Sequence, residues 1–563
     1  MSELIGASAD PSLPAGGGGP GGGGARVNLR RATVGMAVGT GLSRLTGVAR
    51  VLALAYALGF TRLADAYNLA NTIPNMLYDI VLGGVLSATF IPVFVDRLAT
   101  RTERDAWRAI SAVVTLSVVV LAGASVVCFF AAPLIISAFT ALNHAHGGPA
   151  VTVLEHERQV ATTLLRWFVP QIFFYGIIAL STALLNTRRK FAAPAWVPIA
   201  NNLVCVAVLV WFHHVAAVPT LLGAQLHHSQ LVLLGLGTTL GVVVQALLLL
   251  PSLGRARLRR LTWRWEPGHE AVRTVVRLGA WTFGFVMSNQ LALFVVLALA
   301  VGAGGAAPVS SYTYAYTFLQ MPYAVVAVSV MSAVTPDLSE KWATQDLVGF
   351  QRRMAGGLRA VLAIILPAAM GMFLLAKPAV ALLLGHGAGT PARTADTGAA
   401  LAMFALGLPG FCTFLYVVRV LQSMQRTRAA FWLYLVENAV NVGLAVALVH
   451  PLGVRGLALS LSVAYTVGAV CGLAVLRRWL GGLGPPRAYA PLRRVAAATV
   501  LMGVVVLVVS NLSGAETGVG LFVRVVGSAA LGMVVYFAAA ALLANRGHRR
   551  ARPPGPRARG AGP

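Results

Sequence analysis

About fourteen apolar runs follow one another along the chain, and each is long enough to cross the roughly 30 Å hydrocarbon core of a bilayer as a helix. Inside a bilayer the backbone must satisfy its own hydrogen bonds, and runs of this length do so as helices. Only 11% of the 563 residues are charged, far below the roughly 25% of a soluble domain. We therefore expect an all-α, polytopic membrane protein. Its expected spans are 32–58, 66–94, 109–140, 159–186, 192–213, 229–252, 275–301, 308–335, 358–385, 397–422, 429–449, 455–476, 491–512 and 519–543.

A short pattern repeated in the two halves of the chain predicts a two-lobed architecture. Residues 92–100 and 336–344 share a proline, an acidic residue and an Ala-Thr pair at the same spacing. Such repeats are typical of transporters in which two lobes rock about a site between them. The expected parts are a disordered cytoplasmic tail (1–30), an N-lobe of six helices (31–265), a C-lobe of six helices (266–480), two further helices that border a lipid-tail groove (481–545) and a basic cytoplasmic tail (546–563).

The basic residues orient the chain in the membrane. The net charge is +27, and most of the arginines stand in alternate loops. Because loops rich in Lys and Arg stay in the cytoplasm, both termini are expected there. This distribution explains the charge without a nucleic-acid partner. The four cysteines lie inside apolar spans with no CxxC spacing, so neither a metal site nor a disulfide framework is expected.

Two arginines, Arg44 and Arg50, lie inside the first apolar run. A charged side chain near the bilayer centre is unfavourable by roughly 2.5–3.5 kcal/mol, so it is retained where it faces a wet cavity or a partner. Gly39 and Gly47 belong to a row of small residues that lets another helix approach closely. We expect a helix with a cationic side facing a lumen; the alternative is that both arginines pair with structural carboxylates or phospholipid phosphates. Arginines nearer the span ends, such as Arg419, are expected to reach the membrane surface.

A polar stripe follows on the second apolar run. Asp65, Asn68, Asn75 and Asp79 fall close to one face of a helix, and Pro74 is expected to interrupt that helix. Polar side chains at this depth indicate a hydrated lumen, in which either aspartate would be available to the arginines of the first run. A buried structural network of polar groups is the alternative.

Two further sets of polar residues are binding candidates. Tyr316 and Gln320 lie one turn apart on the eighth run, and an aromatic ring beside an amide suits a sugar or a lipid headgroup. Glu437, Asn438 and Asn441 bring a carboxylate and two amides into about one turn of the eleventh run. Oxygen ligands inside a low-dielectric bundle suit a sodium ion or a proton relay, and a structural hydrogen-bond cluster is an equal alternative.

The sequence carries no Walker motif and no nucleophile-base spacing. We therefore expect neither an enzyme nor an ATP-driven pump. No cofactor is expected beyond sodium or protons as a coupling ion.

Three blocks near the N-terminus resemble a known family. SRLTGVAR (43–50), ADAYNLANTIPN (64–75) and GGVLSATFIPVF (83–94) are similar to the MviN/MurJ lipid II flippases. The resemblance continues through 184–198, 319–330 and 417–428. It implies a fourteen-helix member of the multidrug/oligosaccharidyl-lipid/polysaccharide exporter superfamily in the bacterial cytoplasmic membrane. Such a protein moves lipid II, the undecaprenyl-pyrophosphate-linked peptidoglycan precursor, from the inner to the outer leaflet.

The resemblance also implies roles for particular residues. Arg44 and Arg50 would hold the pyrophosphate, with Asp65 as the family's aspartate on the second helix. The last two helices would hold the prenyl tail, and Glu437, Asn438 and Asn441 would form a cation site.

The chain departs from the family at several charged positions. Many members carry a basic pair where this chain has Tyr78 and Asp79, and charged residues where it has Gly83, Thr317 and Gln320. The cationic set is therefore reduced. Another polyprenyl-linked glycan or a drug is an alternative cargo, and a non-transporting scaffold for cell-wall synthesis or division proteins is a second alternative function.

Overall fold

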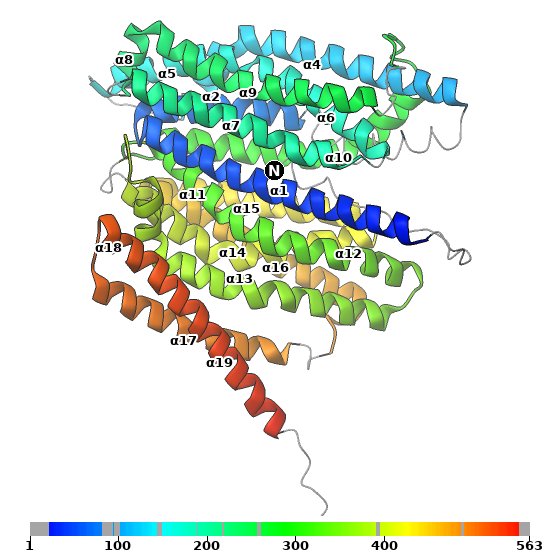
Figure 1. Cartoon of the computed structure of the whole chain (residues 1–563), viewed down its shortest axis with the longest axis vertical. Coiled ribbons are helices and arrows are strands. Elements are labelled where there is room, and N and C mark those ends of the chain that lie inside the picture. The colour runs from blue at the N-terminus through cyan, green and yellow to red at the C-terminus, as the bar shows by residue number, and fades with distance from the viewer. Residues whose placement is uncertain are drawn as a thin grey trace, which may run out of the picture.

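The computed structural model describes residues 22–80, 94, 102–142, 149–188, 190–216, 219–255, 261–389, 394–485 and 489–550. These residues form helices joined by turns and short loops (Figure 1). Among these described residues, thirteen helical segments are long and apolar enough to cross a membrane, and each coincides with an expected span. Of the expected span 66–94, the structure describes residues 66–80 and 94. The all-α membrane fold is thus confirmed. Gly83, most of the repeat segment 92–100 and the outer parts of both tails lie outside the described residues.

The N-terminal half of the bundle runs from α1 to α9. Its described helices are α1 (Gly22–Leu58), α2 (Arg62–Tyr78), α4 (Glu103–Thr140), α5 (Pro149–Phe168), α6 (Pro170–Thr187), α7 (Ala192–Val215), α8 (Leu221–Leu226) and α9 (His228–Arg255). Pro170 starts α6, so α5 and α6 form one span with a break. The helix α2 continues across Pro74, contrary to the expected interruption. A proline removes one backbone donor, and transmembrane helices tolerate this loss when their neighbours support the turn.

The C-terminal half runs from α10 to α16. Its helices are α10 (Glu270–Val301), α11 (Pro308–Pro322), the π-helical turn η4 (Tyr323–Ala327), α12 (Val328–Ala343), α13 (Leu347–Leu384), α14 (Ala395–Ser423), α15 (Thr427–Leu452) and α16 (Val454–Leu480). Beyond them lie α17 (Ala490–Ser513), α18 (Gly518–Phe522), η7 (Val523–Gly527) and α19 (Ser528–Arg550). The segments α11, η4 and α12 follow one another without a loop and form a single span.

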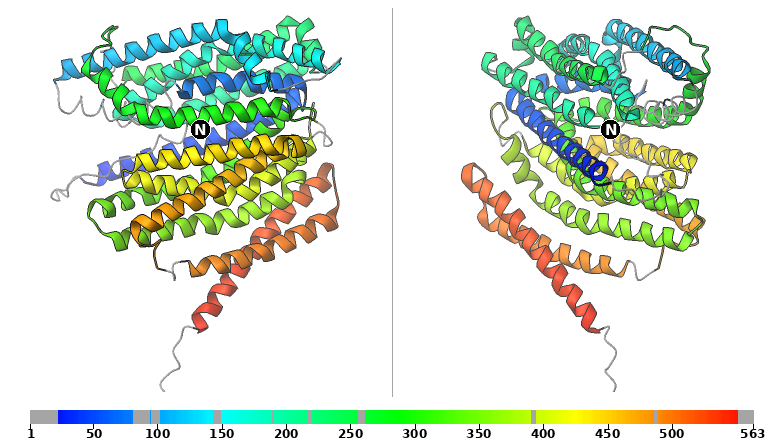
Figure 2. Two further views of the ribbon diagram at one scale, coloured as in Figure 1. Left: turned by 180° about the vertical axis from the view of Figure 1, so that it is seen from behind. Right: turned by 45° about the vertical axis from the view of Figure 1, so that its right-hand side comes forward.

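The two halves lie side by side along the long axis of the molecule. Figure 1 shows α4 to α9 at the top, α11 to α16 below them, and α17 with α19 at the bottom. The helix α10 packs against α4 of the N-terminal half and against α15 of the C-terminal half. The pair α17 and α19 lies at the edge of the bundle in both views of Figure 2 and packs on α13 through a small apolar core.

The two ends of the bundle differ in charge. At one end, here called the arginine-poor end and on the left in Figure 1, α1 finishes and α2 and α11 begin. At the opposite, arginine-rich end α4, α13 and α15 begin. Ion pairs at this end include Arg108 with Glu266 at 3.1 Å and Arg353 with Asp337 at 2.6 Å. Which of the two ends faces the cytoplasm stays a prediction from the loop charges.

Candidate functional site

The two halves of the chain meet at the arginine-poor end through Asp65, which is fully buried. Its Oδ1 accepts a hydrogen bond from the Ser310 backbone N–H at 2.7 Å, and its Oδ2 accepts one from the Val309 N–H at 3.2 Å. Both donors belong to the first turn of α11, whose N-cap residue Ala307 makes no side-chain cap. First-turn N–H groups lack intrahelical partners and favour a negative charge. Asp65 therefore caps α11 from a different helix.

Neighbouring residues extend this contact. The Asn68 Nδ2 donates to the Ser310 Oγ at 2.9 Å, and the Arg62 Nη2 donates to the Gly305 carbonyl at 3.3 Å. We call these contacts, together with those of Asp65, the seal. Because the seal joins α2 to the start of α11, opening the arginine-poor end requires that all of its bonds break.

The end of α1 supports the seal. The Ala388 N–H donates to the Tyr56 carbonyl at 2.9 Å, which joins α1 to the loop between α13 and α14. Gly59 has φ +60° at this approach, and a Cβ there would come within 2.4 Å of the Ala388 carbonyl oxygen. A side chain at this position would therefore strain the backbone and push the loop away. On α5, the buried Glu157 lies 3.6 Å from the Arg62 guanidinium.

Arg50 lies half-buried in the N-terminal half, in a corner lined by hydroxyl groups. Its guanidinium interacts with Tyr67, and Tyr175 and Cys205 are close. The Tyr67 hydroxyl is itself 2.8 Å from the Thr238 Oγ1. No carboxylate among the described residues forms an ion pair with Arg50. Its charge is held in place by neutral neighbours, which leaves it available to an anion.

Arg44 lies about two turns earlier on α1 and is exposed. Arg44 and Arg419 of α14, one arginine from each half, both act electrostatically on the Tyr323 hydroxyl. Arg419 also acts on Tyr434 and is half-buried. The Arg419 Nη1 donates a hydrogen bond to the Oε1 of the exposed Gln422 at 3.3 Å, and its expected reach to the membrane surface stays a prediction.

The small-residue row of α1 packs on α7. A Cβ on Gly39 would come within 2.7 Å of the Trp196 ring, and the Asn202 side chain donates to the Ser43 carbonyl at 3.2 Å. The prediction of a close helix approach along this row is therefore confirmed, and α7 is the partner.

The lower part of the polar stripe has other partners. The Asn75 Nδ2 donates to the Asn71 carbonyl within α2 at 2.9 Å. The Asp79 Oδ2 accepts a hydrogen bond from the Gln290 Nε2 of α10 at 3.1 Å, whereas its buried Oδ1 has no partner among the described residues. The stripe is thus divided between the seal and α10, and neither Asp65 nor Asp79 pairs with Arg50.

The aromatic candidates lie between α11 and α14. The rings of Tyr312 and Tyr316 stack with centroids 6.3 Å apart, and Phe404 of α14 lies 5.8 Å from Tyr316. Gln320 follows one turn later, and both Tyr316 and Gln320 are half-buried. A hydroxyl and an amide are thus presented beside aromatic surface.

The candidate cation site holds a carboxylate that has no hydrogen-bond partner. Glu437 is 1% exposed, and within the described part of the chain neither of its oxygens is hydrogen-bonded. The Asn438 Nδ2 donates to the Asn289 Oδ1 of α10 at 2.8 Å, and the Asn441 Oδ1 accepts from the Ser460 Oγ of α16 at 3.0 Å. The two amides therefore connect α15 to α10 and α16. Of the three candidate residues, Glu437 is the one whose oxygens remain available to bind a cation or a proton. An unpaired charge at such a place would be strongly unfavourable.

Comparison with known proteins identifies the family. A family model described as lipid II flippase MurJ matches residues 54–527. The chain belongs to the MurJ lipid II flippase family. It is similar to the probable lipid II flippase MurJ of Vibrio cholerae, with 28% identity over 78% of this chain and 80% of that protein. It is also similar to the lipid II flippase MurJ of Burkholderia cenocepacia, with 29% identity over 68% of this chain and 71% of that protein.

Solved structures share the MurJ fold. A lipid II flippase MurJ in an inward closed conformation superposes with a TM-score of 0.73 at 20% identity, over 91% of this chain and 99% of that one. An inward-facing MATE family transporter of the MOP superfamily superposes with a TM-score of 0.65 at 16% identity, over 80% of this chain and 98% of that one. These likenesses concern the fold alone.

Sequence reasoning overlooked several members of the site in this MurJ-family chain. Tyr67, which interacts with Arg50, stands inside the block that carries the family resemblance. Asn289 and Gln290 belong to a Ser-Asn-Gln triplet within the apolar α10. Polar triplets inside an apolar span are unfavourable unless they have partners. This triplet could therefore have been recognised in the sequence as a place where α10 contacts other polar groups.

Proposed function

We propose that this chain moves lipid II from the inner to the outer leaflet of the bacterial cytoplasmic membrane by alternating access, for peptidoglycan synthesis. As a MurJ-family protein it is a multi-pass membrane transporter and not an enzyme. One observation carries the mechanism: the arginine-poor end is sealed by Asp65, while the cationic residues of α1 lie on the other side of that seal. The positive-inside rule supports an outer position for the sealed end and a cytoplasmic position for both termini.

The cargo anion is received by arginines from both halves in this proposal. Arg44 and Arg50 on α1, with Arg419 on α14, offer planar guanidinium groups, which suit a pyrophosphate because they form paired charge-assisted hydrogen bonds. Tyr316 and Gln320 would contact the sugar beside them. Hydrogen bonds to charged groups contribute about 1.5–3 kcal/mol each, so loss of one arginine should weaken binding measurably.

Outward opening requires that the seal dissociate. Asp65 and Asn68 would then leave α11 and face the cavity, where they could take part in cargo release. An inward-negative membrane potential favours outward movement of an anion by about 2.3 kcal/mol per charge per 100 mV. The potential therefore supplies part of the driving force in this scheme.

We assign to Glu437 the step that returns the carrier to its cargo-accepting conformation. A sodium ion or a proton would neutralise this buried carboxylate, and the cation would leave or enter as the halves move. Asn438 and Asn441 would hold α15 against α10 and α16 and could add an oxygen ligand when the halves rearrange.

The prenyl tail is assigned to the surface of α17 and α19. These helices carry many exposed apolar side chains, among them Val504, Val508 and Phe537. Such a face in a bilayer accepts a hydrocarbon chain without desolvating polar groups.

The proposal is tested by reconstitution in proteoliposomes with fluorescent lipid II, whose outward movement is followed by quenching from outside. Arg50→Gln should slow translocation by at least about tenfold, which corresponds to one charge-assisted bond. Arg166→Gln is the matched control, because Arg166 is exposed and lies over the Phe129 ring. Equal rates for the two variants would refute the role of Arg50.

The reduced cationic set favours one competing proposal, a different polyprenyl-linked cargo. By the family resemblance, Tyr78 and Asp79 stand at positions where many members carry a basic pair. Identification of the co-purified lipid by native mass spectrometry distinguishes the cargoes. A non-transporting scaffold for division or wall-synthesis proteins would instead rescue a depletion strain after substitution of both α1 arginines.

A further inference from the structure

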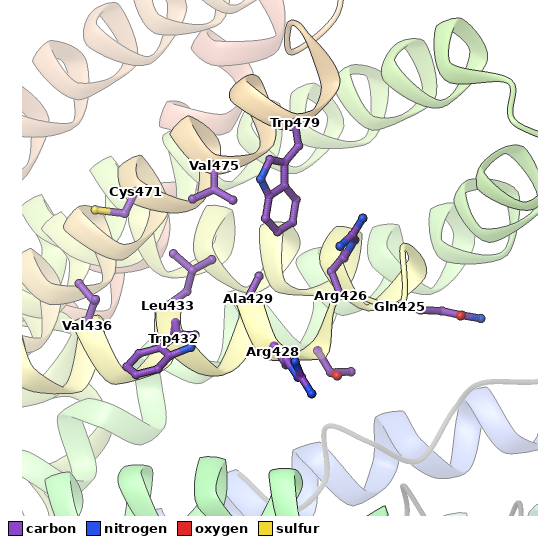
Figure 3. Close-up of a pocket in the computed structure, with 11 residues that line it drawn as sticks. Gln425, Arg426, Arg428, Ala429, Trp432, Leu433, Val436, Cys471, Val475 and Trp479 are labelled. Atoms are coloured by element: carbon purple, nitrogen blue, oxygen red, sulfur yellow. The ribbon is translucent and has the colours of Figure 1, made fainter.

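A groove lies between α15 and α16 at the arginine-rich end (Figure 3). Its volume is about 720 Å³. Its lining includes Arg426, Arg428 and Trp432 of the α15 end and Cys471, Val475 and Trp479 of α16. The groove is basic and polar where α15 begins and apolar further along the helices.

The basic mouth of the groove is organised around two arginines and a tryptophan. The Arg426 guanidinium lies over the Trp479 ring, 5.4 Å from its centroid. Arg428 lines the same mouth, and none of the described lining residues is acidic. A mouth of this kind has a positive potential and complements an anionic group.

The rest of the groove suits a hydrocarbon chain. Trp432 and Trp479 are 60% and 49% exposed, and tryptophans of this kind concentrate at the boundary between headgroups and hydrocarbon. Beyond them Val436, Cys471 and Val475 provide an apolar floor toward the middle of the membrane. The order from charged to interfacial to apolar is the order of groups along a membrane lipid.

We propose that this groove binds one anionic glycerophospholipid, with its phosphate at Arg426 and Arg428 and an acyl chain along α15 and α16. Basic pockets between transmembrane helices on the cytoplasmic side recognise lipid headgroups in this way. The bound lipid is distinct from the transported cargo, and it braces the start of α15, the helix that carries Glu437.

The test uses the full-length protein and native mass spectrometry with dioleoyl phosphatidylglycerol and dioleoyl phosphatidylcholine as probes. The wild type should retain one phosphatidylglycerol in preference to phosphatidylcholine. The double variant Arg426→Gln/Arg428→Gln should bind it about thirtyfold more weakly, because each arginine that lines the groove and faces the bound phosphate contributes about fivefold.

The matched control is Arg477→Gln/Arg478→Gln. These exposed arginines stand in the last turn of α16 at the same end of the bundle, outside the groove lining. The control removes the same charge and should leave the affinity unchanged. Trp432→Ala, which removes a largely exposed ring without altering charge, should also weaken retention and thereby separates groove shape from general electrostatics.

Location is checked with a phosphatidylglycerol that carries a photoreactive group in its acyl chain. Adducts should concentrate on the α15 and α16 peptides around Val436 and Cys471. Equal weakening in both double variants, no headgroup preference, or adducts elsewhere would overturn the proposal. It would also be overturned if the retained molecule had the mass of a polyprenyl pyrophosphate lipid, or if the groove proved to be a dimer contact.

Discussion

Asp65→Ala should release the seal and shift the chain toward a conformation that is open at the arginine-poor end. The substitution removes two hydrogen bonds from α11 backbone N–H groups to a charged acceptor, at 2.7 and 3.2 Å. Hydrogen bonds to charged groups contribute about 1.5–3 kcal/mol each, and part of this is recovered when water reaches the opened end. We take about 2–4 kcal/mol as the net loss, which changes the ratio of open to closed molecules by about 30- to 1000-fold.

The assay is a distance measurement between spin labels at the two sides of the seal. Labels at Glu155 on α5 and Ala306 before α11 are suitable, because both positions are exposed and stand at the arginine-poor end. The wild type should give a short distance population, and Asp65→Ala should add a longer one. Thr61→Ala serves as control, since the Thr61 side chain caps α2 itself and does not reach α11. Identical distance distributions for wild type and Asp65→Ala would refute the reasoning.

Three other perturbations probe the surrounding structure. Glu437→Gln should remove the sodium or pH dependence of translocation while leaving the protein folded, because the amide is neutral; dependence equal to that of the wild type in flux assays would exclude this residue as the coupling site. The Arg108 guanidinium, which hydrogen-bonds Glu266, holds the pKa of Glu266 below its ordinary value. The contact therefore stabilises the fold above the ordinary pKa of a glutamate and is lost as the pH falls through the lowered pKa, so melting temperatures of wild type and Glu266→Gln should converge in acid; a constant difference would contradict this. Gly59→Ala should weaken the seal through strain at φ +60° and produce the longer spin-label distance, and an unchanged distance would argue against that role.

Much of the fold was predictable because a bilayer requires long apolar runs to form membrane-spanning helices. Thirteen expected spans coincide with helical segments, since long apolar runs have few alternatives in a bilayer. Details inside the spans were less predictable. The helix α2 passes through Pro74, and a single span is divided into α5 and α6 before Pro170, although both sites contain the same residue type. The difference depends on neighbouring helices, which sequence periodicity does not describe.

The candidate site shows a similar division. Charged residues within apolar runs marked Arg44, Arg50 and Asp65 as costly to bury and therefore of functional interest. The partner of Asp65 could not be predicted from the sequence. It is the backbone N–H of Ser310, and every residue except proline carries such a group. Arg419 was assigned to the surface from its place near a span end, whereas its half-buried position depends on how α14 packs on its neighbours.

The central claim, that Arg44 helps to carry a lipid-linked anion across the membrane, is tested most directly by a leaflet-resolved lipid II assay in cells. The charge-reversing variant Arg44→Glu is compared with the wild type at equal expression. The account predicts that lipid II accumulates in the inner leaflet of the variant and that its outer-leaflet fraction falls to the level of the depleted strain. Outer-leaflet lipid II equal to that of the wild type would contradict the account.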